Sequence, residues 1–385
     1  MVFIKAQGEN MFGFEILDLK RENGKRFYEN GKRFYYDKIR IHRLMKEIED
    51  FIEEEPFLDD FNFSRKMILS LEIKTNNSIE GLNDDINSIE EAIKSNNYQE
   101  SNKRILNLYY AYRYILLNRQ INKETIKKLY GILSKDLLDD YAQSNMGEYY
   151  RNRDVYILSS RPNQMLLSYE KGIDPEKIEE AMNDLLQYMN QLEEKTPIET
   201  FIHSQIIHFY FVYIHPYYDV NGRTARTLSL WYLLRKKAYP FVIFNRGISL
   251  SKGEYKHNVK KSYRGNITPF LEYVLKTLKK ELEKEKIIYN IRTNFGESLS
   301  KSEYEILEYV LTVKTHKIQD IIKLYLKNNS QQDREKVLLE RIYPLIEKGI
   351  LIINEEEQTL KINKNFITID NRKVKKLRIK SYLSE

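Results

Sequence analysis

Along most of the chain, apolar residues recur every three to four positions, which is the spacing of one buried face on an α-helix. The clearest start signal is Thr196 followed by Pro197 and Glu199, a capping box with proline at the first helical position. We expect a helix from there to about Tyr213. A turn follows, and a second apolar-rich helix is expected to open at Arg223.

The other helical segments are bounded by proline, glycine and asparagine. They are expected over residues 41–82 with a break at Pro56, 88–138, 174–194 and 254–282. Rough period-two alternation, typical of a strand, occurs over residues 147–158 (GEYYRNRDVYIL) and predicts a hairpin with an exposed edge. The expected fold class is therefore mostly α with one small β-hairpin.

The N-terminal segment differs from this pattern. It contains the heptad ENGKRFY twice in succession, at residues 22–28 and 29–35. The two Asn-Gly pairs predict turns between short strands. A coiled coil is not expected, because glycine recurs in every heptad.

The last hundred residues also change character. Three helices are expected, from Ser302 and over residues 318–326 and 330–347, followed by short strands at 349–353 and 359–362. Three helices and a hairpin are the elements of a winged helix. The tip of the wing is Glu355–Glu357, which would repel phosphate, so a structural or dimer-forming module is favoured over a DNA-binding one.

Composition bounds the remaining possibilities. The 385 residues suffice for two or three domains, and the absence of cysteine excludes disulfides, thiol catalysis and thiolate metal sites. No run of eighteen apolar residues and no signal-like segment occurs, so a cytoplasmic protein that does not insert into membranes is expected. The net charge of +7 is spread along the chain and does not by itself indicate a nucleic-acid partner.

Residues 215–226, HPYYDVNGRTAR, bring together a titratable base, a carboxylate and two arginines around a sharp turn. The turn precedes the helix expected from Arg223, whose free N–H groups and dipole favour anions at its N-terminus. Arginine adds a planar donor group that suits phosphate oxygens. The segment therefore predicts a polyphosphate site.

Taken singly, these residues have simpler explanations. Asp219 and Asn221 are common turn residues, and arginines three apart on a helix can be solvated. His203 and His208, inside the expected helix, are interpreted as structural histidines. Their spacings to His215 argue against a shared metal site.

Jointly, the twelve residues resemble the signature of the Fic family, H-x-F-x-D/E-G-N-G-R-x-x-R. The agreement covers His215, Pro216, Asp219, Asn221, Gly222, Arg223 and Arg226. Tyr217 stands in place of the phenylalanine and Val220 in place of the first glycine. The resemblance implies a Fic helical core with a β-hairpin flap, an N-terminal helical extension and a C-terminal winged helix.

The resemblance also implies a reaction, the transfer of AMP from Mg²⁺-bound ATP to a hydroxyl side chain of a target protein. In that reaction His215 would be the general base and Asp219 would bind Mg²⁺. Val220, Asn221 and Gly222 would form the loop that binds the phosphate anion. Arg223 would bind the inner phosphates and Arg226 the γ-phosphate. Tyr255 matches a family tyrosine that lines the adenine site.

Two further segments resemble parts of the same family. Residues 72–82 (EIKTNNSIEGL) are similar to an inhibitory helix whose glutamate, here Glu80, binds the second arginine of the signature, Arg226. Asn76 stands where that pattern has serine or threonine, and a plain helix ending at Gly81 is the structural alternative. Residues 147–158 resemble the flap, on which a target segment would dock by strand pairing.

The expected division is 1–100 for the N-terminal region, with the inhibitory helix near 66–81, 101–285 for the Fic core and 286–385 for the winged helix. A homodimer is possible. Three alternatives to AMP transfer stay open: removal of AMP from a modified protein, transfer of another phosphate-containing group because Val220 alters the loop, and an idle regulatory protein.

Overall fold

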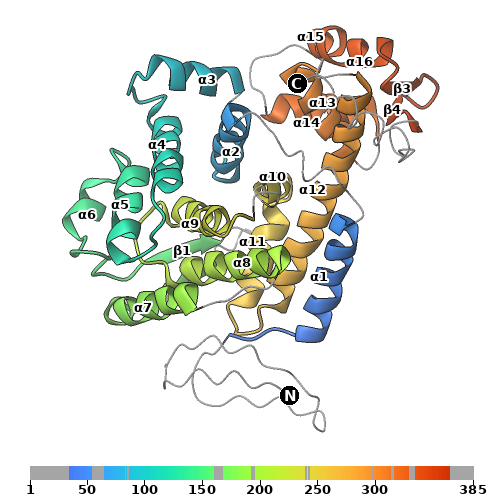
Figure 1. The fold of residues 1–385 in the computed structure, drawn as a ribbon. Coiled ribbons are helices and arrows are strands. Elements are labelled where there is room, and N and C mark those ends of the chain that lie inside the picture. The colour runs from blue at the N-terminus through green and yellow to red at the C-terminus, as the bar shows by residue number, and fades with distance from the viewer. Residues whose placement is uncertain are drawn as a thin grey trace, which may run out of the picture. The chain divides into compact units, whose positions relative to one another are not determined.

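The computed structural model describes residues 34–53, 65–82, 84, 86–159, 168–191, 196–238, 241, 243–295, 299–313, 316–328 and 334–364. These residues are mostly helical, with two small antiparallel sheets of two strands each, which confirms the expected fold class (Figure 1). The repeat at 22–28 and nearly all of its copy at 29–35 lie outside the described residues.

Contacts between residues divide the chain into two units, which are described separately. The first unit comprises residues 1–54, 61–80 and 86–279. Its elements are α1 (Lys38–Glu53), α2 (Arg65–Ile79), α3 (Ile86–Ser95), α4 (Lys103–Leu117), α5 (Lys123–Ser134), α6 (Asp140–Ser144), β1 (Tyr156–Ser159), β2 (Ser168–Lys171), α7 (Pro175–Gln191), α8 (Pro197–Ile214), α9 (Asn221–Arg235), α10 (Phe244–Leu250) and α11 (Lys252–Ser262). Helix α12 (Thr268–Phe295) begins in this unit and ends in the other.

Helix α8 forms the centre of the first unit. Fourteen of its 18 residues are buried, as expected for a helix that is apolar all round. It packs against α9, α7 and α1, and α9 in turn contacts α4 and α5. In Figure 1, α8 and α9 accordingly lie in the middle of this unit.

The predicted start of α8 is confirmed in detail. The Thr196 side chain accepts a hydrogen bond from the N–H of Glu199, the Glu199 side chain accepts one from the N–H of Thr196, and Pro197 opens the helix. The capping box fixes where α8 begins, and the helix ends 18 residues later at Ile214.

Two segments that the sequence predicts to be helical are each divided into more than one helix. The segment 88–138 contains three helices, because Asn96 adopts a left-handed conformation (φ 50°) after α3 and Asn118 ends α4 in an extended one. The segment 254–282 contains two, since the chain turns at Gly265 (φ 105°) between α11 and α12. Helical periodicity continued across both breaks and concealed them.

The expected hairpin is present, but its first strand begins later in the chain than the sequence indicates. Strands β1 and β2 pair antiparallel from Tyr156 opposite Lys171 to Ser159 opposite Ser168. The residues before β1 form bends, with one isolated bridge between Met146 and Arg151. The predicted strand and exposed edge are therefore wrong over 147–155, because Arg151 turns inward to bond backbone carbonyls and is 2 % exposed.

The second unit comprises residues 55–60, 81–85 and 280–385. Its described elements after α12 are α13 (Lys301–Thr312), α14 (Ile318–Asn328), α15 (Arg334–Val337), a π-helical turn (Leu338–Ile342), α16 (Tyr343–Glu347), β3 (Leu351–Asn354) and β4 (Thr359–Ile362). The strands pair antiparallel, with Leu351 opposite Ile362. Helices and hairpin follow in the predicted order; their assignment as a winged helix stays a prediction.

Candidate active site

His215 is the first residue of the loop between α8 and α9. His215 ends α8 as its C-cap in a left-handed conformation (φ 52°, ψ 59°), and its N–H donates to the carbonyl of Phe211. Its ring Nδ1 lies 3.3 Å from the carbonyl oxygen of Val212. A carbonyl can only accept, so Nδ1 carries the proton and Nε2 is left with a free lone pair.

Burial keeps this imidazole uncharged. It lowers the pKa of His215 to about 4; the bond to Val212 and the Asp219 carboxylate act in the opposite direction, and the nearby Arg151 cation acts in the same direction as burial. At neutral pH the ring is therefore an unprotonated base. This is the state that a general base must have before it accepts a proton.

The following turn is held by Asn221, whose side chain is buried. Its Oδ1 accepts from the N–H of Tyr217 (3.0 Å) and its Nδ2 donates to the carbonyl of the same residue (2.8 Å). The ring of Tyr217 stacks on Tyr130 with centroids 3.5 Å apart. Asn221 is thus committed to shaping the loop, and its backbone N–H, not its side chain, remains for an anion.

One feature of Tyr217 is unfavourable, and it supports a stability prediction. Its hydroxyl is buried without a hydrogen-bond partner among the described residues, which costs about 1–3 kcal/mol. We expect Tyr217→Phe to keep the ring stack and raise the free energy of unfolding by about 1 kcal/mol. Urea denaturation would show a higher midpoint at an unchanged slope, while the exposed Tyr141→Phe should leave the midpoint unchanged. A lower midpoint for Tyr217→Phe would show that the hydroxyl is stabilising.

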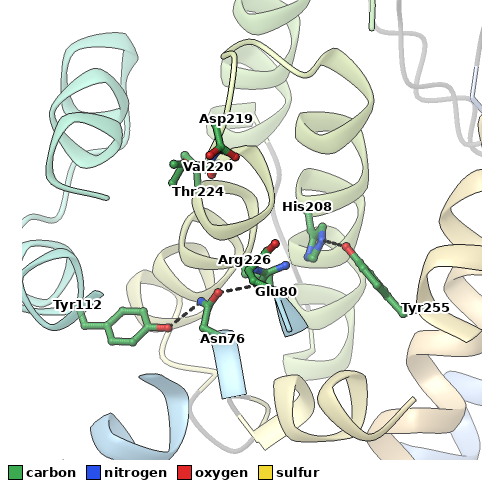
Figure 2. A network of polar contacts seen from close by, with 9 residues as sticks. All are labelled: Asn76, Glu80, Tyr112, His208, Asp219, Val220, Thr224, Arg226 and Tyr255. Carbon is green, nitrogen blue, oxygen red and sulfur yellow. Dashed lines mark hydrogen bonds and ion pairs between the residues drawn. The ribbon is translucent and has the colours of Figure 1, made fainter. Parts of the chain in front are cut away.

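Val220 adopts a conformation that β-branched residues avoid. It is buried and left-handed, with φ 64° and ψ 8°. Its N–H donates to Asp219 Oδ1 (2.6 Å), and its carbonyl accepts from both the N–H and the hydroxyl of Thr224 (Figure 2). The valine therefore adopts a left-handed backbone, a region that favours glycine, with strain on the order of 1–2 kcal/mol.

Arg223 lies in the first turn of α9. It is 8 % exposed, and its Nε and Nη1 have no hydrogen-bond partner in the described part of the chain. Burial lowers its pKa, which the charges of Glu80 and Asp219 oppose. Buried donors are normally satisfied, so these two fit a site for an anion at the N-terminus of α9.

Arg226, one turn further along α9, is already occupied. Its Nε donates to Asn76 Oδ1 (2.9 Å), and its Nη2 forms a hydrogen-bonded ion pair with Glu80 Oε1 (Figure 2). Asn76 Nδ2 in turn donates to the hydroxyl of Tyr112 on α4 (3.0 Å). Asn76 thereby supplies the polar contact for which the sequence pattern has a hydroxyl residue.

The carboxylate of Glu80 is ionised in this arrangement. Burial opposes its ionisation, but Arg226 overcomes that effect, with smaller help from Arg223 and Lys256, and the pKa of Glu80 is lowered. A Cβ on Gly222 would lie 3.0 Å from Glu80 Oε1 and 3.2 Å from Arg226 Nη1. Any larger residue at 222 would therefore push the carboxylate or the guanidinium aside by a few tenths of an ångström.

Tyr255 and His208 lie on the other side of Arg226. His208 Nε2 is 2.7 Å from the hydroxyl of Tyr255, and both side chains are buried (Figure 2). Burial lowers the pKa of His208 to about 3, with a contribution from Arg226, so the ring is neutral. The structure thus brings together His215, Asp219, Val220, Asn221, Gly222, Arg223 and Arg226 in one loop and helix start, and Glu80 and Tyr255 beside Arg226.

Sequence reasoning missed two residues of this site. Tyr112 orients Asn76 from a different helix, and no local pattern marks it. Glu72, two turns before Glu80 on α2, is buried, accepts from Asn245 Nδ2 (2.9 Å), and has a pKa raised to about 7 by burial. A buried acid on the same helix face as Asn76 and Glu80 was visible in the sequence as an i, i+4, i+8 spacing.

Residues 120–233, which span α5 to α9 and contain the whole loop, match the model of the Fic/DOC family. These residues form a Fic/DOC-family domain. The chain is 26% identical over 174 residues to the protein adenylyltransferase Fic of Drosophila mojavensis, covering 44% of this chain and 32% of the relative. It is 29% identical over 116 residues to the protein adenylyltransferase fic-1 of Caenorhabditis elegans, covering 30% and 22%.

The Fic fold is also found by structural comparison. A Fic family protein from Desulfovibrio desulfuricans G20 superimposes with a TM-score of 0.51 at 16% sequence identity, over 84% of this chain and 95% of that one. The chain spans about a third or less of the length of the two relatives named above. Among the described residues, no helix is both long enough and apolar enough to cross a membrane.

Proposed function

We propose that this Fic protein is a protein adenylyltransferase that transfers AMP from ATP to a hydroxyl side chain of a protein. The observation that carries the proposal is a neutral His215 with a free Nε2 on the same short loop as Arg223, a buried cation with two unsatisfied donors. A base and an anion-binding side chain so close together suit attack on a bound phosphate. The names of the two relatives support the same reaction.

In the proposed reaction, the hydroxyl oxygen of the target attacks the α-phosphorus of ATP. A phosphorus–oxygen bond forms, the bond between the α-phosphorus and the bridging oxygen breaks, and pyrophosphate leaves. His215 Nε2 accepts the hydroxyl proton. Arg223 and the free N–H groups at the start of α9 stabilise the charge on the phosphates.

Asp219 fits the role of a magnesium ligand. Its side chain is exposed, and its second oxygen has no hydrogen-bond partner in the described part of the chain. A hard cation at nucleotide sites commonly takes one carboxylate together with phosphate oxygens. When bound, Mg²⁺ would neutralise negative charge on the phosphates.

We further propose that Glu80 restrains the reaction. The ion pair with Glu80 and the bond to Asn76 use Nη2 and Nε of Arg226, two of the donors that a γ-phosphate would need. ATP would then bind without its outer phosphate in place. Its α-phosphorus would be misaligned, and misplacement of about 1 Å can lower a rate by about 10²-fold.

The target would dock on the flap. In a sheet of two strands, β1 and β2 each leave one edge unpaired, and an extended segment could add a strand there. Tyr156, at the start of β1, is 62 % exposed.

The test of the proposed function uses ATP labelled at the α- or the γ-phosphate. Self-modification of the Glu80→Gly variant serves as the readout, since no target has to be known. Label bound to the protein from α-labelled ATP alone supports AMP transfer. Label from γ-labelled ATP would indicate phosphate transfer, and label from neither would favour AMP removal or an idle protein.

Val220 supplies a prediction that separates rate from stability. Val220→Gly should lose about 1.5–3 kcal/mol of burial and regain about 1–2 kcal/mol of strain, so the variant is slightly less stable. Its loop N–H groups gain freedom to face the phosphates, so α-label incorporation should rise. Val220→Ala loses burial without relieving the positive φ and should show no gain. A Val220→Gly rate equal to that of the wild type would show that the valine does not impair the loop.

A further inference from the structure

Arg151 is a buried arginine that bonds only backbone. It is 2 % exposed, and its guanidinium donates to three carbonyl oxygens: Nε to His215 (2.8 Å), Nη1 to Arg153 (2.6 Å) and Nη2 to Ile173 (2.6 Å). No carboxylate of the described residues pairs with it. A buried cation whose donors all meet carbonyls of separate segments serves to hold those segments together.

Its backbone adds a fourth contact to the same place. The N–H of Arg151 donates to the carbonyl of Pro216 (3.0 Å). Arg151 therefore binds both consecutive carbonyls of the peptide units that follow the base, His215 and Pro216. His215 is left-handed there, a conformation that costs on the order of 1 kcal/mol for a residue with a Cβ and persists only where the surroundings fix it.

The other two carbonyls belong to the flap. Arg153 lies three residues before β1 and Ile173 two residues after β2, and the N–H of Gly172 bonds the carbonyl of Val155 beneath the hairpin. One guanidinium thus spans both ends of the hairpin and the end of α8.

Gly172 gives independent evidence that the position is built around this side chain. A Cβ on Gly172 would lie 2.8 Å from Arg151 Nη2 and 3.5 Å from the Cβ of His215. Carbon and nitrogen do not approach to 2.8 Å without a bond, so even alanine would displace the guanidinium or the backbone.

We propose that Arg151 is the positioning residue of this site. It holds the backbone of His215 in place and keeps it at a fixed position relative to both ends of the β1–β2 hairpin. A target segment paired to the hairpin then has its hydroxyl aligned with Nε2 of His215 before any chemistry occurs. The identity of the reaction comes from the proposed function, whereas the contacts of Arg151 do not depend on it. Arginine carries five donors on three nitrogen atoms in a planar fork, so each of these carbonyls meets its own nitrogen, whereas lysine has a single nitrogen.

The test compares Arg151→Met, Arg151→Lys and Gly172→Ala in the Glu80→Gly background. Misalignment of the base should lower kcat for self-modification about 10²-fold in Arg151→Met, with ATP affinity within about twofold of the parent. Lysine keeps a charge but not the fork, so Arg151→Lys should recover little. Gly172→Ala should lower kcat as well. Arg153→Met, an exposed neighbour that contributes only its carbonyl, is the matched control.

A second readout does not depend on transfer. The pKa of the His215 imidazole, followed by NMR without ATP or Mg²⁺, should rise in Arg151→Met, because a positive charge beside the ring is lost while Asp219 remains. If the parent transfers no AMP, this shift still tests whether the Arg151 cation lies beside the imidazole, so the two failures are distinguishable. A folded Arg151→Met with parental kcat and parental His215 titration would overturn the proposal. If that variant does not fold, parental kcat in Gly172→Ala overturns it instead.

Discussion

Replacing His215 with alanine is expected to reduce transfer by about 10²- to 10⁴-fold, the usual cost of losing a general base. ATP affinity should be nearly unchanged, because the groups proposed to bind the phosphates are the Arg223 side chain and the N–H groups at the start of α9. The two quantities are measured as the rate of α-label incorporation and as ATP binding by titration calorimetry. The exposed His257→Ala is the matched control and should alter neither.

The pH dependence of the rate at acid pH tests the same assignment in the protein that keeps His215. Because burial lowers the pKa of His215 to about 4, its base form persists well below neutrality. We expect kcat/KM to fall as the pH drops through about 4. A near-normal rate in His215→Ala would contradict the assignment of His215 as base. A fall near 6.5 would instead agree with a histidine base and show that burial does not lower the pKa of His215.

Replacing Glu80 with glycine is expected to raise the rate of modification by about tenfold to a hundredfold. The basis is the charge-assisted bond between Glu80 and Arg226, worth about 1.5–3 kcal/mol when well formed. Glu80 is 36 % exposed, so water screens part of this interaction. Asn76 also continues to hold Arg226 Nε in the variant. Both effects place the expected gain near the lower figure.

Three companion variants define the cause of that gain. Glu80→Gln keeps the shape without the charge and should accelerate less than Glu80→Gly. Asn76→Ala should give a small gain by itself, because it frees one donor of Arg226. The double change Glu80→Gly/Arg226→Ala should lose the gain, since the released arginine is then missing. Equal rates in wild type and Glu80→Gly would mean that α2 carries an ordinary capped helix end and no restraint.

The start of α8 and the loop after it could be predicted from the sequence because their determinants are local. The Thr196–Glu199 capping box, the turn at Asn221 and the two arginines each act within a few residues. The sequence also indicated that the helix leading to Glu80 ends at Gly81. The φ of Gly81 is 91°, a left-handed value that favours glycine.

The parts that the sequence did not predict depend on contacts between distant segments. Arg151 fits a strand pattern by its position, yet its donors are satisfied by carbonyls 64 and 22 residues away, and this turns the side chain inward. Tyr112 reaches Asn76 from 36 residues away. The left-handed backbone of Val220 is another such feature, since a β-branched residue disfavours it: Thr224 and Asp219 bind its carbonyl and N–H and hold that conformation.

The most direct test of the central claim is the intact mass of the Glu80→Gly protein after incubation with Mg²⁺ and ATP, beside the Glu80→Gly/His215→Ala protein treated identically. We expect the first protein to gain the mass of one or more AMP groups. We expect the second, in which Arg223 is unchanged, to stay unmodified over the same time. A gain equal to a phosphate group, or equal AMP addition with and without His215, would contradict AMP transfer with His215 as the base.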